Sequence, residues 1–387
     1  MKLSRGCAWN PKSHRPSSYT THMSIENKNS PMNNSSIRRV LVYRLGSIGD
    51  TVVALPSLHL IARSFPFAER RILTNFPVNG KAAPMDHVVG KSGLIQSYLM
   101  YPIGTRNIRC LWRLRSQIAN WSPDVLVYLA KPRGQLKVFR DALFFYLCGI
   151  RKLIGVPYLP SQQKVRKLES DRMYESEAHR LLRCISSIGR IDVDDTVNWD
   201  LHLNPDELNE ADQLLRTWEG KDSFITVGIG TKEINKDWGV ENWHSVLGRI
   251  SAQYPKLGMA LIGSALDHEG SEYSAMKWAG PKVNLCGKTS PRVCAAVIGR
   301  SILYVGPDSG PMHLAAANRI PCVAIFSVQH RPGEWYPIGR HHSVICPNVV
   351  CGAATRTRLN GKQREKMMTN AVDEVFAAII EKLQNVA

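Results

Sequence analysis

The stretch RRVLVYRLGSIGDTVVALPSLHLIAR, residues 38–63, decides the fold that we expect for this chain. Its first part, 38–44, is mostly apolar with β-branched valines, which is typical of a short buried strand. A loop with two glycines follows, and from Asp50 onward the apolar residues recur at roughly helical spacing. Strand, glycine loop and helix in this order predict the first unit of a Rossmann-like domain.

The same alternation continues along the 387 residues of the chain. Because strands that alternate with helices of this length pair in parallel through right-handed crossovers, we expect parallel sheets. The length favours two such α/β domains in tandem, with a cleft between them. Strands are predicted at 71–74, 124–129, 152–155, 223–229, 259–263, 283–285, 302–306 and 322–326, and helices at 50–63, 108–120, 136–148, 205–218, 240–254, 268–279, 290–299, 312–318 and 370–384.

Composition and pattern suggest where the domains begin and end. The N-terminal residues are rich in Ser, Asn, Pro and Lys without an apolar period, and this predicts a disordered leader. The expected order is a leader at 1–36, a first domain at 37–200, a linker and helix at 201–222, a second domain at 223–345, and a tail with a helix at 346–387.

Several classes of protein are disfavoured by composition. Hydrophobic residues make up 44% and charged residues 21%, which is typical of a globular protein. The longest apolar run, 142–150, is too short to span a bilayer.

The helical spacing of this run predicts a core segment, with contact to a membrane surface as the alternative. The nine cysteines never form C-x-x-C, which disfavours a disulfide framework or zinc site and fits a reducing cytosol without a secretory signal.

Basic residues are concentrated in the first half of the chain. Lys and Arg exceed Asp and Glu by 18, and residues 1–200 contain 30 basic and 14 acidic residues. A field of this sign attracts polyanions or an anionic bilayer, although a merely solubilising surface is the alternative.

A nucleic-acid-binding protein is a second hypothesis, but helix-turn-helix, zinc-finger and RNP patterns are missing from the sequence. A dehydrogenase is disfavoured because G-x-G-x-x-G is absent.

The most informative segment is YVGPDSGPMHLAAA, residues 304–317. A predicted strand ends here, and Asp308 or Ser309 is in a position to cap the helix that follows. Gly310 allows a ligand to approach the backbone, and the first N–H groups of the helix form an anion site. His313 is expected at the same mouth. An ordinary, well-capped helix is the alternative interpretation.

A second candidate site is GIGTKEINKDWGVENW, residues 228–243. Glycines end a predicted strand, and Thr231, Lys232 and Lys236 lie in the loop ahead of a helix. A lysine in this place offers a point charge to a phosphate, whereas a solvated loop lysine is the alternative.

A third candidate is LIGSALDHE, residues 261–269, where small residues and carboxylates follow a strand. Ser264, Asp267 and Glu269 stand at the start of a predicted helix. Acidic side chains in this place either cap the helix or hold the hydroxyls of a ribose.

In the first domain, the loop Gly-Ser-Ile-Gly-Asp at 46–50 is neither a Walker A loop nor a dinucleotide fingerprint. Asp50 falls at a helix N-terminus directly after a glycine, so the helix dipole favours its ionised form and the small neighbour leaves it reachable. It is therefore a candidate general base, with a helix-capping carboxylate as the alternative.

Five motifs in a fixed order resemble the heptosyltransferase family, glycosyltransferase family 9. The resemblance covers about residues 38–345. The motifs are R-L-x-S-I-G-D-x-x-x-x-x-P at 44–56, K-x-W-x-x-E-x-W at 236–243, G-S-x-x-D-x-E at 263–269, C-G-K-T-S at 286–290 and D-S-G-P-M-H-L-A-A-A at 308–317.

The resemblance implies a GT-B fold, with the acceptor in the first domain and a nucleotide sugar in the second. It further implies inverting transfer of a heptose from ADP-heptose to a lipopolysaccharide-type acceptor, or use of a different nucleotide hexose. The residue roles that it implies are Asp50 as general base; Thr231, Lys232, Lys236, Asp308, Ser309, Gly310 and His313 around the diphosphate and sugar; and Ser264, Asp267 and Glu269 at the ribose and base.

The remaining expectations concern the acceptor, metals and location. A lysine and a helix terminus suffice to neutralise a leaving diphosphate, so we expect no obligatory divalent metal and no metal site. The acceptor is expected to be an anionic glycolipid or glycan, met in the cytoplasm at the inner face of the membrane. Its expected contacts are Ser47, Gly49, Lys131 and Arg133. Of the cysteine cluster found near the C-terminus of many family members, only Cys346 and Cys351 remain.

Overall fold

The computed structural model describes residues 36–76, 83–102, 104–131, 133–168, 173–216, 223–233, 236–327, 331–346 and 361–386. These residues belong to one compact unit that spans 34–387. The leader expected at 1–36 lies, apart from its last residue, outside the described residues, and so does Cys351.

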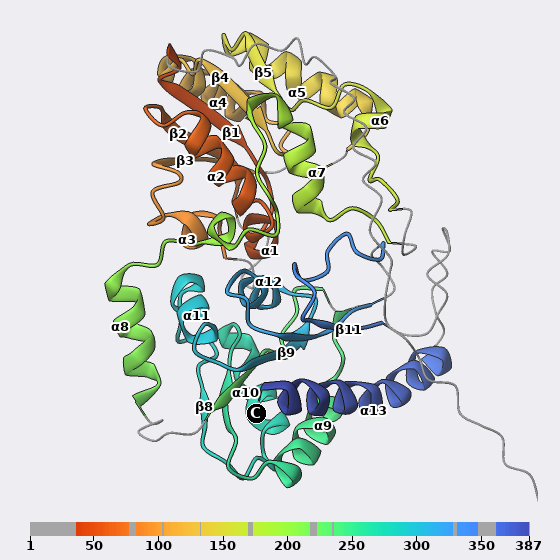
Figure 1. Ribbon diagram of the computed structural model, residues 1–387. Coiled ribbons are helices and arrows are strands. Elements are labelled where there is room, and N and C mark those ends of the chain that lie inside the picture. Colours follow the sequence, from red (N-terminus) through yellow and green to blue (C-terminus); the bar gives the residue numbers. More distant parts are fainter. Residues whose placement is uncertain are drawn as a thin grey trace, which may run out of the picture. The chain divides into compact units, whose positions relative to one another are not determined.

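The described strands form two parallel sheets, as the alternating pattern predicts (Figure 1). The second sheet has the strand order of a doubly wound Rossmann domain, and the first has the same order without a sixth strand. In order across the first sheet the strands are β3 (Ser97–Tyr101), β2 (Glu69–Asn75), β1 (Arg39–Tyr43), β4 (Val125–Tyr128) and β5 (Lys152–Ile154); across the second they are β11 (Ser343–Ile345), β10 (Cys322–Ile325), β9 (Leu303–Pro307), β6 (Phe224–Val227), β7 (Gly258–Leu261) and β8 (Lys282–Asn284).

In the first half, helices α4 and α5 pack on the same side of the first sheet. Leu114 of α4 and Phe145 of α5 share one core with Leu41 of β1 and Tyr128 of β4. Helix α2 instead packs against α7. The helices of this half are α1 (Ile48–Val52), α2 (Leu55–Ser64), α3 (Asp86–Val89), α4 (Ile108–Trp121), α5 (Gln135–Leu147), α6 (Pro160–Gln163) and α7 (Glu177–Cys184), with short 3-10 turns η2 (Ser186–Ile188) and η3 (Thr196–Trp199).

In the second half, the C-terminal helix α13 packs beside α9 over the second sheet. Val375 and Ile379 of α13 join Trp243 and Val246 of α9 in one core with Val305 of β9. Within the described residues, no helix has the length and apolar character needed to cross a membrane. The helices here are α8 (Pro205–Leu214), α9 (Val240–Gln253), η6 (Ala265–Asp267), α10 (His268–Ser274), α11 (Pro291–Ile298), α12 (Gly310–Ala317) and α13 (Gly361–Val386).

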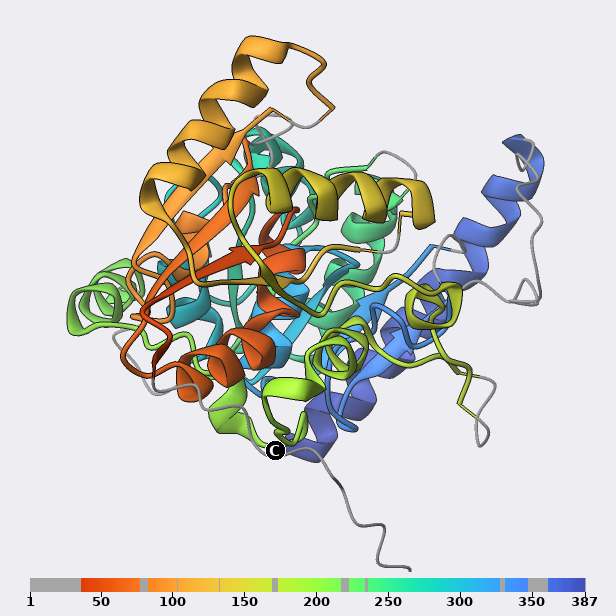
Figure 2. The same cartoon turned by 90° about the horizontal axis from the view of Figure 1, so that it is seen from above.

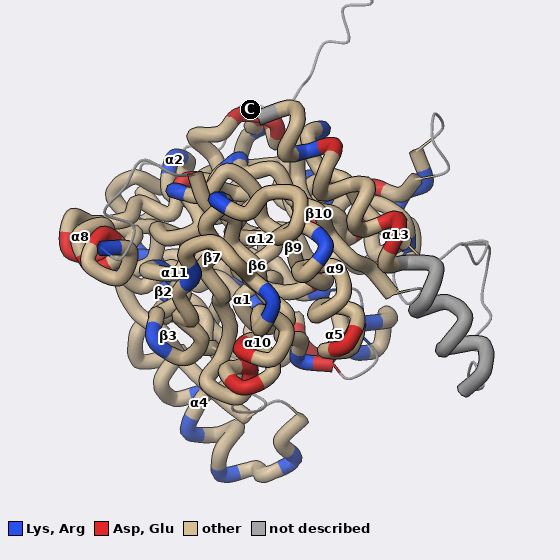
Figure 3. Tube along the Cα trace, turned by 90° about the horizontal axis from the view of Figure 1, so that it is seen from below, with Lys and Arg blue, Asp and Glu red and all other residues tan. Residues whose placement is uncertain are grey.

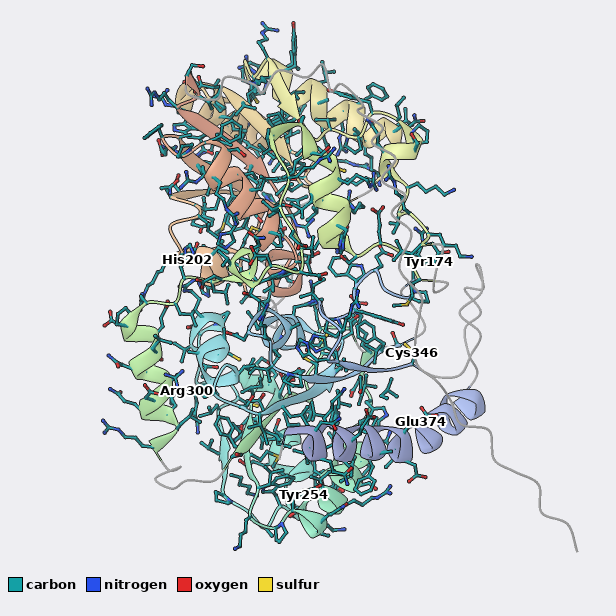
Figure 4. All side chains as sticks on the ribbon, viewed as in Figure 1. Tyr174, His202, Tyr254, Arg300, Cys346 and Glu374 are labelled. Atoms are coloured by element: carbon teal, nitrogen blue, oxygen red, sulfur yellow. The ribbon has the colours of Figure 1, made fainter. Side chains whose placement is uncertain are left out.

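Helix α8 connects the two sheets and lies alongside α11 (Figures 1 and 4). The buried Arg292 of α11 forms a bidentate ion pair with Glu207 of α8, with distances of 2.7 and 2.9 Å. The same guanidinium donates to the carbonyls of Val88 and His202, so it ties segments of the first half to the second. The region expected as a linker is therefore anchored on the second half.

The element boundaries differ from the predictions in a few places. The single helix expected at 50–63 is two helices, because Pro56 has no N–H to continue the first one. The terminal helix starts at Gly361 rather than 370, and α10 ends at Ser274 rather than 279. Strands β3 and β11 and helices α3, α6 and α7 were not expected, since their segments are short or lack a clear apolar period.

Candidate active site

Two ion pairs lie at the carboxyl edges of the two sheets, each at the point where the strand order reverses. In the first sheet, β1 and β4 lead to Asp50 and Lys131. In the second sheet, β6 and β9 lead to Lys236 and Asp308. Open parallel sheets bind ligands at these positions, because the adjacent loops diverge there and leave a crevice.

Asp50 occupies the first turn of α1, and its carboxylate is held by the loop before it. Oδ2 accepts the backbone N–H of Ser47 at 2.9 Å. Oδ1 lies 2.6 Å from Lys131 Nζ and 3.9 Å from Arg44 Nη2. Burial favours the neutral form, but the two cations and the Ser47 bond outweigh it and lower the pKa of Asp50. The carboxylate is thus ionised at neutral pH.

A buried cluster of Arg44, Glu177 and Arg180, called here the arginine–glutamate triad, supports this arrangement. Arg44 donates to the carbonyl of Asp50 from Nε at 3.1 Å and Nη2 at 2.8 Å. Its Nη1 donates to Glu177 Oε1 at 3.0 Å, and Arg180 clasps the same carboxylate through two nitrogens. Arg44 and Arg180 also donate to the carbonyls of Leu129 and Ala130. The triad therefore fixes the backbone on which both Asp50 and Lys131 stand.

The side chain of Lys131 contacts residues of both halves of the chain. Besides its ion pair with Asp50, its ammonium lies 4.3 Å from the ring centroid of Trp335, which belongs to the segment between β10 and β11. That segment is tied to the first half by backbone bonds, from Glu177 N–H to Glu334 and from Tyr174 N–H to Pro332. Tyr174 is labelled in Figure 4.

On the opposite side, the N-terminus of α12 faces α1. Lys236 Nζ lies 2.8 Å from Asp308 Oδ2, and both side chains are largely buried. Ser309 is the N-cap residue and Gly310 follows it in the cavity wall, so the N–H groups of Gly310 and Met312 lack intrahelical acceptors, whereas Pro311 has no N–H and His313 N–H bonds back to Ser309 at 3.4 Å. Burial lowers the pKa of His313 to about 4 against the pull of Asp308 and Asp50. The imidazole is therefore neutral at neutral pH.

Glycines allow α1 and α12 to approach each other closely. A Cβ atom at Gly310 would lie 2.8 Å from Cβ of Ile48. A Cβ atom at Gly49 would lie 2.9 Å from Cδ2 of His313. Real Cβ atoms do not come so near, so a side chain at Gly310 would require the helices to separate, and one at Gly49 would require the His313 ring to shift. The loop that carries Asp50 is thereby kept against the helix that carries the anion site.

The third segment contributes a small polar turn at the end of β7. Asp267 Oδ2 accepts from the N–H of Ser264 at 2.8 Å and from its hydroxyl at 2.6 Å. Gly230, after β6, approaches this carboxylate so closely that a Cβ would lie 2.3 Å from it. The lining of the cavity also includes the less polar residues Pro291, Cys294 and Leu314, and burial raises the pKa of the Cys294 thiol to about 12.

These groups line one cavity of about 600 Å³, a size typical of ligand sites. Its wall carries three lysines and four carboxylates, so the cavity as a whole has no net positive charge. A positive potential is expected only near Lys232, Lys236 and the start of α12. Of the residues expected from sequence, the lining includes Ser47, Gly49, Asp50, Lys131, Thr231, Lys232, Lys236, Ser264, Asp267, Asp308, Ser309, Gly310 and His313.

Two expected residues lie elsewhere. The guanidinium of Arg133 binds Asp141 and the Tyr43 hydroxyl instead of lining the cavity. Glu269 is an exposed residue in the first turn of α10 and is also absent from the lining. Both follow a strand closely in sequence, but each lies beyond the loop that reaches the cavity.

The cavity also contains residues that sequence reasoning missed. Thr289 belongs to the quoted motif at 286–290, and the position of this motif directly after strand β8 could have indicated that it reaches the cavity. Trp335 gave no signal, because its segment has no regular period. The other lining residues outside the expected set are Ile48, Ala83, Pro84, His87, Gly230, Glu233, Gly263, Pro291, Cys294, Pro311 and Leu314. Among the described residues, no cluster of three His, Cys, Asp or Glu side chains could hold a metal ion.

Comparison with solved structures identifies this architecture. The chain is similar to a family 9 glycosyl transferase from Veillonella parvula, with a TM-score of 0.66 at 16% identity over 90% of this chain and 98% of that one. It is also similar to the ADP-heptose lipopolysaccharide heptosyltransferase II of Escherichia coli, with a TM-score of 0.61 at 16% identity over 90% and 100% of the two chains. The GT-B fold expected from the sequence is confirmed.

Sequence comparison points the same way. The lipopolysaccharide core heptosyltransferase OpsX of Haemophilus influenzae is 24% identical over 150 residues, which are 38% of this chain and 41% of that protein. The match thus spans less than half of the relative. A model of the family described as Glycosyltransferase family 9 (heptosyltransferase) matches residues 135–362, well over half of the chain, though not the segment around Asp50. Cavity, fold and sequence agree, and the chain belongs to glycosyltransferase family 9.

Proposed function

We propose that this chain is an inverting glycosyltransferase that moves a heptose from ADP-heptose to a lipopolysaccharide-type acceptor. One observation carries the proposal: Asp50 of the first half and the Lys236–α12 anion site of the second half line the same cavity. The names of the relatives, which include a lipopolysaccharide core heptosyltransferase and an ADP-heptose-dependent one, support the choice of donor and acceptor.

In the proposed reaction, Asp50 is the general base. Its carboxylate takes the proton of the acceptor hydroxyl while the hydroxyl oxygen attacks the anomeric carbon of the sugar. The bond from that carbon to the diphosphate breaks on the opposite face, so a single displacement inverts the configuration. Because the base stands on the first half and the anion site on the second, the two groups are suited to opposite faces of the sugar.

The leaving diphosphate gains negative charge as its bond breaks, and we assign its stabilisation to Lys236, Lys232 and the first N–H groups of α12. Fixed dipoles and a buried lysine stabilise such charge without reorganisation. Ser264 and Asp267 are proposed to hold the ribose, and the more apolar wall around Cys294 the base. This assignment requires no divalent cation, so excess EDTA is expected to leave the rate unchanged.

The acceptor is proposed to be an anionic glycolipid met at the inner face of the cytoplasmic membrane. The basic first half and the position of Lys131 beside Asp50 support this assignment. Lys131 is the proposed acceptor contact, with the loop of Ser47 and Gly49 beside it.

The test is transfer by the full chain, offered ADP-heptose or GDP-, UDP- and dTDP-sugars, to acyl-free core acceptors. Turnover is expected with ADP-heptose, and Asp50→Asn should lower kcat by about 10²- to 10⁴-fold while donor binding persists. Asp373→Asn, at an exposed surface ion pair with Arg249, is the matched control. Turnover with another donor alone would replace the assigned sugar, and wild-type turnover by Asp50→Asn would overturn the base assignment.

A further inference from the structure

Helix α5 has two apolar faces, of which only one is used by the core. Val138, Ala142 and Phe145 are buried against the first sheet. The side chains of a second row are at least half exposed, from 87% at Leu136 to 51% at Tyr146. We call this row the α5 stripe; it consists of Leu136, Phe139, Leu143, Tyr146 and Leu147.

The spacing of the α5 stripe is helical, since its members are three, four or one residues apart. They therefore lie on one side of the helix, away from the buried row. A helix at the surface of a globular protein ordinarily has a single apolar face, and a second exposed one marks a contact surface. The apolar run 142–150 is thus divided: Ala142, Phe145, Cys148 and Ile150 belong to the core, while Leu143, Tyr146 and Leu147 are exposed.

Neighbouring elements extend the stripe on both sides. The ring of Tyr158 lies 5.6 Å from that of Phe139, and the exposed Leu159 follows it. On the α4 side, Arg115 donates to the carbonyl of Leu147 at 2.9 Å and lies over the exposed ring of Trp112. In Figure 2, α5 (olive) lies on the viewer's side of the first half.

The surroundings of the stripe are basic. Lys137 and Arg140 are on α5, and the guanidinium of Arg151 lies 4.1 Å from the ring centroid of Tyr146. Helix α4 carries Arg109, Arg113 and Arg115 and no acidic residue (Figure 3). The acidic residue of α5, Asp141, is buried and pairs with Arg133 and Arg140. An apolar row with a basic rim is the pattern of helices that lie in the interface of an anionic membrane.

The stripe also lies close in the chain to the acceptor end of the cavity. Lys131, which pairs with Asp50, follows β4, and α5 begins four residues later at Gln135. A bilayer in contact with the stripe would hold a lipid-anchored acceptor near the proposed base.

We propose that the α5 stripe and its basic rim dock this chain onto an anionic phospholipid bilayer, with the stripe at the level of the headgroups. This deepens the proposed function and rests on its lipid-anchored acceptor. A second copy of the chain is disfavoured as occupant, because a two-fold contact would bring two basic rims together. A nucleic acid is disfavoured because three of the five stripe residues are leucines, which neither pair with phosphates nor stack on bases as aromatic rings do.

The experiment is flotation of the full chain with vesicles of phosphatidylethanolamine and phosphatidylglycerol in equal amounts, compared with phosphatidylcholine vesicles. Binding is expected to the anionic vesicles and to weaken with salt. Leu136→Glu with Leu143→Glu is expected to reduce binding by at least about tenfold. Phe67→Glu, at an exposed aromatic residue of the same half outside α4 and α5, is the control and should bind as wild type.

A second pair of variants tests the charges. Lys137→Gln with Arg151→Gln should reduce vesicle binding roughly 30-fold at low salt, since each basic residue near an anionic surface contributes separately. Lys256→Gln with Lys277→Gln, two exposed lysines of the second half, should have little effect. All these side chains are exposed, so the variants should melt as wild type does.

The two proposals fail in different ways. Transfer to an acyl-free acceptor should be the same in wild type and the Leu136→Glu, Leu143→Glu variant, whereas transfer to the acceptor embedded in vesicles should fall only in the variant. Normal transfer without vesicle binding would overturn the docking surface alone. A dimer broken by the variant, or DNA binding in place of vesicle binding, would also overturn it. Vesicle binding without any sugar transfer would support the docking surface but overturn the proposed function.

Discussion

The ammonium of Lys131 lies 2.6 Å from Oδ1 of Asp50, and this ion pair crosses the point where the strand order of the first sheet reverses. The carboxylate is otherwise bonded through Oδ2, to the N–H of Ser47. Lys131 therefore adjusts the proton affinity of the carboxylate oxygen that Ser47 does not hold, in addition to any contact with an acceptor.

The first prediction follows from this pair. In Lys131→Met, burial of Asp50 is no longer opposed by the lysine, so the pKa of the carboxyl rises. A general base must be ionised, so the acidic limb of the profile of kcat/KM against pH should move to higher pH. A fall in rate by the same factor at every pH would instead mean that Lys131 serves only to bind the acceptor. Arg133→Met, which changes a cation outside the cavity, should leave the position of the limb unchanged.

Much of the cavity could be predicted from the sequence because it is built where parallel strands end. The loops after β1, β6, β7 and β9 contain small residues followed by polar ones, and the carboxyl ends of parallel strands share one edge. Local pattern is enough to identify such loops. It does not show which side chains pair with each other, and the Asp50–Lys131 and Lys236–Asp308 pairs both join residues of different loops.

Other parts of the site could not be predicted from the local sequence pattern. Helix α7, EAHRLLRC, was not expected from the sequence, and its Glu177 and Arg180 are buried although both are charged. Glu177 pairs with Arg180 on its own helix and with Arg44, which lies 133 residues earlier in the chain. Trp335 likewise reaches Lys131 from a segment without periodicity. Contacts of this range depend on how distant segments pack, within the first half for Arg44 and Glu177 and between the halves for Lys131 and Trp335, and no single segment encodes this packing.

The second prediction concerns Lys236. Replacing it by Met should weaken the binding of ADP by about 10- to 100-fold, because a charge-assisted hydrogen bond contributes about 1.5–3 kcal/mol. The affinity for adenosine, which lacks the diphosphate, should not change. Titration calorimetry of Lys236→Met, Lys236→Arg and the exposed-surface control Lys256→Met would measure this. Equal losses for ADP and adenosine would show that Lys236 supports the fold near Asp308 and does not contact phosphate.

The third prediction concerns the arginine–glutamate triad. Glu177→Gln leaves two buried guanidinium groups without their shared carboxylate, and the expected cost is about 3–5 kcal/mol of unfolding free energy. Burial favours the neutral acid, but Arg180 and Arg44 outweigh it and lower the pKa of Glu177 below its usual 4.5. The stabilisation is therefore complete above about pH 4.5 and is lost as the pH falls further.

Urea unfolding between neutral and acidic pH checks both parts of this prediction. The free energy of unfolding of the wild type should fall below about pH 4.5. That of Glu177→Gln should be lower already at neutral pH and should decline less steeply as the pH falls. Asp373→Asn, at an exposed ion pair, should change the stability by less than about 1 kcal/mol. Parallel pH curves for wild type and Glu177→Gln would mean that another carboxylate controls the acid transition.

The fourth prediction tests the close approach of α1 and α12. Gly310→Ala places a Cβ 2.8 Å from that of Ile48, so the two helices must separate, at a cost of about 1–3 kcal/mol. Since separation moves the Asp50 loop away from the anion site, kcat should fall more than the affinity for ADP. Gly248→Ala is a matched control in helix α9: its Cβ would meet only the flexible side chain of Lys277, at 3.3 Å from Cδ. That variant should gain up to about 1 kcal/mol from helix propensity and keep full activity. If Gly310→Ala were as stable and as active as Gly248→Ala, the two helices could not be in contact in the working enzyme, and the geometry on which the proposed transfer depends would have to be abandoned.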